Sequence, residues 1–116
     1  MILEITPHEL AARLADPTPF VLLDVREALE LRLARLDDPR VEWSPLSRLA
    51  YSGFEALPAP VRADKQAEIV VFCHHGMRSA DVTAWLQSQG WMQVRNLEGG
   101  IDAYARLIDP KVGIYE

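Results

Sequence analysis

The residues best suited to chemistry lie in one short segment around Cys73, the only cysteine in the chain. Gly76 follows three positions after it and Arg78 five positions after it. A glycine permits the positive φ angle of a tight turn, and an arginine offers a planar cation with several donors for an oxyanion. A lone cysteine is more often a small buried apolar residue, but such a residue needs neither of these neighbours. The spacing therefore predicts a nucleophilic sulfur in an anion-binding turn.

The elements on either side of this turn are expected to place the sulfur at one edge of a sheet. Residues 69–72 (IVVF) form an apolar, β-branched run typical of a strand buried on both faces. A helix is expected from about Ser79 to Gln89, with Gly90 as its C-terminal cap. Sites in open α/β sheets form where strands end and helices begin. If the turn curls around the sulfur, its backbone N–H groups and the helix N-terminus favour a thiolate there.

The rest of the chain alternates between expected strands and helices. Strands are expected at residues 2–5, 20–25, 41–43 and 92–96. Helices are expected at residues 7–15, 27–36 and 101–108, with one or two short helices within residues 46–57. Thr6 and Glu9 can form a capping box, and Leu29, Leu33 and Leu36 stand at helical spacing. This order predicts an α/β fold in a single domain, residues 1–116, with a mostly parallel sheet of about five strands covered by helices on both faces.

The composition narrows the classes of function. The 116 residues include 12 Lys and Arg against 17 Asp and Glu, and this formal charge of −5 argues against a nucleic-acid partner. The apolar runs are far shorter than the ~20 residues of a membrane helix, and no secretion signal is visible, so a cytoplasmic protein without a membrane partner is expected. One cysteine allows neither an intramolecular disulfide nor a cysteine-rich zinc site.

His74 and His75 lie inside the turn, and two interpretations of them stay open. They are either solvent-facing loop residues or part of the site. Neighbouring histidines are expected to point in different directions, and the chain has only one other, His8. Neither a metal site nor a cofactor is therefore predicted.

Four segments together resemble the rhodanese family of sulfurtransferases. Residues 21–27 (VLLDVRE) are similar to its second-strand motif, and residues 73–79 (CHHGMRS) to the active-site loop of its single-domain members. Residues 97–104 (LEGGIDAY) are similar to the closing motif, which usually has Trp in place of Tyr104, and the stretch from Asp109 to Tyr115 resembles a tail of some members. One stretch differs from the family: residues 35–46 (RLDDPRVEWSPL) stand where the family has His-Ile-x-Gly-Ala. The resemblance therefore does not define the shape of the pocket rim or the substrate preference.

The resemblance implies sulfur transfer in two half-reactions. Cys73 would take the outer sulfur of thiosulfate, or of a protein or low-molecular-weight persulfide, and pass it to cyanide or a thiol, including a protein acceptor. The loop amides of His74, His75, Gly76, Met77, Arg78 and Ser79 would hold the thiolate and the persulfide. Arg78 would also bind the sulfonate end of thiosulfate, and Ser79 would cap the following helix.

Asp24 and Arg26 end the neighbouring strand, and the resemblance implies that they brace the site. The alternative is a surface ion pair of little energetic value. Since the chain has no second cysteine, a persulfide on Cys73 has to pass its sulfur to an external acceptor.

Two other classes of function compete with sulfur transfer. Cysteine phosphatases and arsenate reductases also place a thiolate after a strand, but five residues separate their Cys from their Arg, and only four do here. The shorter loop suits one sulfur atom better than a phosphoryl group. The second class is a binding module or a sulfur carrier with protein partners, and the altered residues 35–46 are compatible with it.

Overall fold

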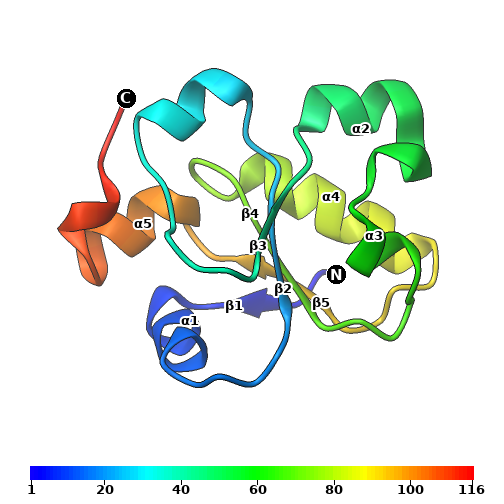
Figure 1. Ribbon diagram of the computed structural model, residues 1–116, viewed down its shortest axis with the longest axis horizontal. Helices are drawn as coiled ribbons and strands as arrows, with labels where there is room; N and C mark the ends of the chain where they lie inside the picture. Colours follow the sequence, from blue (N-terminus) through cyan, green and yellow to red (C-terminus); the bar gives the residue numbers. More distant parts are fainter.

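The computed structural model describes residues 1–116 and shows a sheet of five parallel strands (Figure 1). The strands lie in the order β1-β5-β4-β2-β3. Their bounds are Glu4–Ile5 (β1), Val21–Asp24 (β2), Val41–Trp43 (β3), Ile69–Phe72 (β4) and Val94–Leu97 (β5). The α-helices are Pro7–Leu14 (α1), Leu46–Ser52 (α2), Ala59–Arg62 (α3), Met77–Ser88 (α4) and Gly100–Leu107 (α5), and the 3₁₀ helices are Ala28–Arg32 (η1), Gly53–Ala56 (η2) and Pro110–Val112 (η3).

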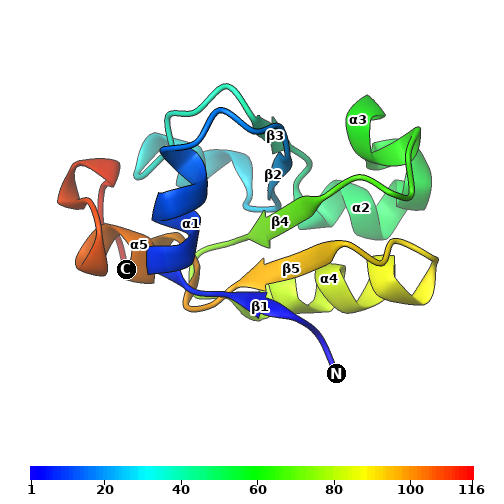
Figure 2. The ribbon, with the colours of Figure 1, turned by 90° about the horizontal axis from the view of Figure 1, so that it is seen from below.

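Helices cover both faces of the sheet, which confirms the expected α/β class (Figure 2). On one face, Leu49, Val61 and Leu86 from α2, α3 and α4 belong to one buried cluster. On the other face, Leu10 of α1 and Ile101 of α5 belong to a second cluster. Alternate side chains of β2 and β4 divide between the two clusters. Both strands are thus buried on both faces, as their unbroken apolar runs predict.

The first helix begins as its sequence predicts. Thr6 accepts the backbone N–H of Glu9 at 3.1 Å, and the Glu9 carboxylate accepts the backbone N–H of Thr6 at 2.9 Å. This reciprocal pair satisfies two of the N–H groups that a helix start leaves without partners.

The helix expected over residues 27–36 is wrong in type and in extent. Only η1 is helical there, and it is a 3₁₀ helix. Leu29 is 76% exposed and Leu33 55% exposed, while Leu36 is buried. The reason is that Glu30, rather than Leu29 or Leu33, faces inward: its carboxylate binds Arg78 through two hydrogen bonds. The polar contacts of one residue therefore override the apolar spacing.

The parallel strands bring their carboxyl ends to one edge of the sheet. Asp24 of β2 lies beside Phe72 of β4, and Asn96 of β5 lies beside Val71. The segment that follows β4 thus emerges between the ends of β2 and β5, as expected for a site in this class of fold. No helix in the structure combines the length and the apolar character needed to cross a membrane.

Candidate active site

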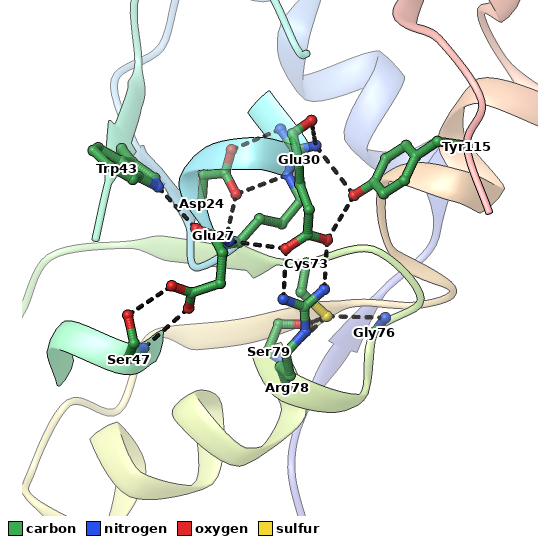
Figure 3. A network of polar contacts seen from close by, with 11 residues as sticks. Asp24, Glu27, Glu30, Trp43, Ser47, Cys73, Gly76, Arg78, Ser79 and Tyr115 are labelled. Carbon is green, nitrogen blue, oxygen red and sulfur yellow. Dashed lines mark hydrogen bonds and ion pairs between the residues drawn. The ribbon is translucent and has the colours of Figure 1, made fainter. Parts of the chain in front are cut away.

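Cys73 follows β4 directly, and its sulfur lies at the N-terminus of α4 (Figure 3). The residue is buried, with 1% of its surface exposed. Its Sγ atom accepts the backbone N–H of Gly76 at 3.2 Å and that of Ser79 at 3.4 Å. Gly76 occupies the N-cap position and has no side chain to offer, so the sulfur takes the place of the usual capping oxygen. N–H groups and a helix N-terminus in this position stabilise negative charge on sulfur.

Ser79 is not the helix cap that the sequence predicts. The helix begins at Met77, and Ser79 is its third residue. Its hydroxyl lies 3.3 Å from the sulfur of Cys73 and 2.6 Å from Oδ1 of Asn96. The expected start was wrong because the acceptor for the free N–H groups comes from Cys73, before the turn, rather than from a residue next to the helix.

Asn96 is a site residue that the sequence analysis missed. Its amide nitrogen donates to the carbonyl of Gly76 at 3.1 Å and to the carboxylate of Glu4 at 3.0 Å. Its carbonyl oxygen consequently faces Ser79 and receives the hydroxyl hydrogen. A neutral thiol can then donate to the Ser79 oxygen, and a thiolate can receive that hydrogen if the hydroxyl turns. The sequence carries no clear signal for this role, because Asn96 follows the charged Arg95 in β5, and only the structure shows that Asn96 is buried at 1% exposure.

Helix α5 holds the backbone of the turn. The N–H of Ile101 donates to the carbonyl of Cys73 at 2.9 Å, and that of Asp102 to the carbonyl of His74 at 3.0 Å. Gly100 makes this approach feasible, because a Cβ atom there would lie 2.6 Å from the Cys73 carbonyl oxygen. Gly76 has the positive φ that the turn requires, +97°. The side chain of the next residue, Met77, points away from the turn's interior, since 79% of its surface is exposed. The motif at residues 97–104 thus positions the turn that carries the sulfur.

The two histidines of the turn have different surroundings. His74 is 8% exposed, so it does not face solvent. Its ring stacks on Tyr115 with centroids 3.8 Å apart, and its Nε2 lies 2.8 Å from the Tyr115 carbonyl oxygen. The side chain of His75 is 60% exposed and lies 3.8 Å from the carboxylate of Asp102.

The expectation that the two histidines diverge is also wrong. Their ring centroids are 3.8 Å apart. Together with Asp102 they bring potential ligand atoms within 4.8 Å of one another. In a tetrahedral zinc site with bonds of about 2.0–2.1 Å, ligand atoms lie only about 3.4 Å apart. The present arrangement is therefore wider than such a site.

Asp24 and Arg26 form a buried ion pair beneath η1. The Arg26 guanidinium donates to both carboxylate oxygens of Asp24, at 3.0 and 2.9 Å, and the two side chains are 0% and 4% exposed. The alternative of a surface pair is therefore wrong. Arg26 also donates to the backbone carbonyl of Glu30 at 3.2 Å and to the hydroxyl of Tyr115 at 3.3 Å. The pair thus connects the end of β2 to η1 and to the tail.

Glu30 is the second residue that the sequence analysis missed. Its carboxylate accepts from Nη1 and Nη2 of Arg78, at 2.7 and 2.8 Å, and from the hydroxyl of Tyr115 at 2.8 Å (Figure 3). The hydrogen bonds from Arg78 lower the pKa of Glu30 to about 2, and burial raises the pKa of Tyr115 to about 12. Glu30 is therefore ionised and Tyr115 protonated across the neutral pH range. A carboxylate three residues from the start of a short helix gave no sign of this contact, because its partner lies 48 positions away.

Comparisons with known proteins find related sequences and a related fold. A model of the rhodanese-like domain matches residues 6–107. The Arabidopsis thaliana protein named rhodanese-like/PpiC domain-containing protein 12, chloroplastic, is 35% identical over 115 residues, and the present chain spans only 37% of its length. A protein of Allochromatium vinosum named sulfurtransferase is 32% identical over 109 residues, which are 91% of either chain. A rhodanese-like domain protein of Staphylococcus aureus has the same fold, with a TM-score of 0.74 at 24% identity over 99% of this chain and 100% of that one.

Proposed function

This chain belongs to the family of rhodanese-like domains, and we propose that it moves a sulfane sulfur from thiosulfate or a persulfide to a thiophilic acceptor through a persulfide on Cys73. The observation that carries the proposal is the capping position of the sulfur. A buried Sγ that accepts two backbone N–H groups at a helix N-terminus is suited to exist as an anion. The same donors can hold the terminal sulfur of a persulfide after the first half-reaction.

In the first half-reaction the Cys73 thiolate attacks the outer sulfur of thiosulfate. The S–S bond of the donor breaks, its electron pair leaves with sulfite, and Cys73 carries a persulfide anion. In the second half-reaction cyanide or an external thiolate attacks the terminal sulfur. Thiocyanate or a new persulfide leaves, and the Cys73 thiolate is restored. No second cysteine of the chain competes as acceptor.

The other residues of the turn receive supporting roles in this proposal. The backbone amides of His74 to Ser79 would line the space around the transferred sulfur. Arg78 would use the N–H groups that Glu30 does not occupy to bind the outer end of the donor. Asp24 and Arg26 would brace η1, which carries Glu30, without contacting the donor.

Intact-mass analysis after treatment with thiosulfate tests the proposal directly. We expect a gain of one sulfur atom that a reductant reverses and that Cys73→Ser lacks. A parallel incubation with a protein persulfide tests the sulfur-carrier version of the function, since a carrier would gain sulfur from that donor and not from thiosulfate.

Activity assays separate sulfur transfer from the phosphatase alternative. Thiocyanate formation from thiosulfate and cyanide should be measured beside aryl-phosphate hydrolysis. Phosphate release without thiocyanate, lost in Cys73→Ala, would overturn the proposal.

A further inference from the structure

Glu30 neutralises Arg78, the one arginine of the turn, and so reduces the attraction of the site for a doubly charged sulfur donor. Building on the sulfur transfer proposed above, we propose that Glu30 makes the Cys73 site prefer sulfane donors with a single negative charge, such as a persulfide or thiosulfonate anion, over the thiosulfate dianion. Glu30 is thereby assigned as a residue that determines specificity by acting through Arg78.

Arg78 and Glu30 form a bidentate ion pair, in which two N–H groups of the guanidinium bind the two carboxylate oxygens. Nη1 of Arg78 lies 2.7 Å from one carboxylate oxygen of Glu30, and Nη2 lies 2.8 Å from the other. The side chains are 32% and 17% exposed, so water screens the pair only in part. A bidentate arginine–carboxylate pair of this kind carries no net charge and has strong directional preference. A donor that approaches Arg78 therefore meets a neutral pair, not a free cation.

Glu30 is held in this position from two further sides. The Tyr115 hydroxyl donates to the oxygen that faces Nη2, at 2.8 Å, and the backbone N–H of Glu27 donates to the other oxygen, at 2.9 Å. The carboxylate thus accepts four hydrogen bonds. Because its pKa is about 2, it does not lose its charge near neutral pH. Release of Arg78 by rotation or protonation of Glu30 would require giving up several of these contacts.

The charge of the donor decides how much this pairing matters. Thiosulfate brings two negative charges to a thiolate, and without a free Arg78 only N–H groups and a helix N-terminus oppose the repulsion. A persulfide or thiosulfonate anion brings one charge fewer. The chain as a whole, at −5, adds no attraction for an anion at long range.

The chemistry balances for each class of donor. A persulfide, RSS⁻, and the Cys73 thiolate give RS⁻ and the Cys73 persulfide anion. Methanethiosulfonate, CH₃SO₂S⁻, gives methanesulfinate and the same product. In both cases the S–S bond of the donor breaks, its electron pair leaves with the departing group, and neither oxidant nor reductant is consumed.

The test compares thiosulfate with methanethiosulfonate, which has nearly the same shape and one negative charge fewer, and adds cysteine persulfide as a donor of the persulfide class. Thiosulfate, methanethiosulfonate and cysteine persulfide should each load Cys73 in the wild type and in Glu30→Gln, at fixed ionic strength. In the wild type we expect a lower KM for methanethiosulfonate than for thiosulfate. In Glu30→Gln, which frees Arg78, the KM for thiosulfate should fall about fivefold or more relative to that for methanethiosulfonate, the effect of one extra unit of charge a few ångströms from a cation.

Glu27→Gln is the matched control. Glu27 immediately precedes η1, so the variant removes one negative charge close to Glu30, but the Glu27 carboxylate binds Ser47 and not Arg78. The ratio of the two KM values should change less than twofold in this variant. Arg78→Ala should act in the opposite sense to Glu30→Gln, raising the KM for thiosulfate more than it changes kcat.

The outcomes distinguish this inference from the function on which it rests. If no donor loads Cys73 in the wild type, both fall. If all three donors load it, but Glu30→Gln and Glu27→Gln have the same effect on the KM ratio, the specificity role of Glu30 is wrong and the sulfur transfer stands. A wild-type preference for thiosulfate over methanethiosulfonate would overturn the role of Glu30 even if the Gln variant failed to fold.

Discussion

At the scale of single residues, the sulfur of Cys73 is the acceptor that completes the start of α4, and in the proposed reaction it is also the reacting atom. The same atom therefore has to satisfy N–H groups before the reaction and share them with a transferred sulfur afterwards. The hydroxyl of Ser79 is the one neighbour that can change its hydrogen bond, between Asn96 and the sulfur, as the charge on the sulfur changes. We therefore expect the Ser79 hydroxyl to assist formation of the Cys73 thiolate and persulfide anions rather than binding of the sulfur donor.

This role predicts the effect of Ser79→Ala. The variant removes a donor to the sulfur and leaves the carbonyl of Asn96 without its partner, so persulfide formation should slow roughly tenfold to a hundredfold with little change in the KM of the donor. Intact-mass analysis of samples quenched at successive times gives the rate of persulfide formation on Cys73. Thr83→Val is the control, since Thr83 is a buried hydroxyl one turn later that bonds the carbonyl of Ser79 and not the sulfur. Equal rates in the two variants would remove the hydroxyl of Ser79 from the reaction.

At the scale of elements, α5 and the turn are coupled through their backbones. Two N–H groups from the first turn of α5 hold the carbonyls of Cys73 and His74, and Gly100 lies against both carbonyls. Gly100 has a φ of +65°, so an alanine there would be strained twice, by its backbone conformation and by its Cβ atom.

Gly100→Ala should therefore disturb the site more than an alanine placed at another glycine with a positive φ but without close backbone neighbours. Gly90→Ala provides the comparison, because Gly90 also has a positive φ, +106°, yet a Cβ there would meet only the flexible Lys65 side chain at 3.4 Å. Gly90→Ala should cost about 1–2 kcal/mol of stability and preserve persulfide formation. Gly100→Ala should cost more in a thermal unfolding experiment and should slow loading of Cys73. Similar losses in both variants would show that the close contact is unimportant.

The elements that sequence alone could predict are those whose causes are local. Unbroken apolar runs identified β2 and β4, and a capping box identified the start of α1. The failures share a different cause: the deciding partner is remote in the chain. Glu30 turns inward because Arg78 lies 48 positions later, and α4 begins early because Cys73 supplies its cap. The turn around Cys73 was predictable from spacing, whereas the inward positions of Glu30 and Asn96 could be found only from their contacts in the structure.

At the scale of the whole molecule, the site draws on segments from the full length of the chain. Tyr115 bonds Glu30 across 85 positions, and Asn96 bonds Glu4 across 92. The tail and the first strand thus support a turn that neither of them contains. Such long-range contacts form only when the sheet is complete, so integrity of the site and stability of the fold should be lost together.

The overall charge gives the last prediction. With 17 acidic against 12 basic side chains, the molecule repels an anionic donor at long range, while attraction is local, from the N–H groups beside Cys73 and from those of Arg78 that Glu30 does not occupy. Raising the ionic strength from about 10 mM to about 200 mM shortens the screening length from roughly 30 Å to below 10 Å, which weakens the distant repulsion more than the contacts at the sulfur. The KM for thiosulfate should therefore fall about twofold with added KCl, and that for methanethiosulfonate should fall less, since it carries half the charge. A KM that rises with salt would mean that local cations, Arg78 first among them, outweigh the charge of the whole molecule.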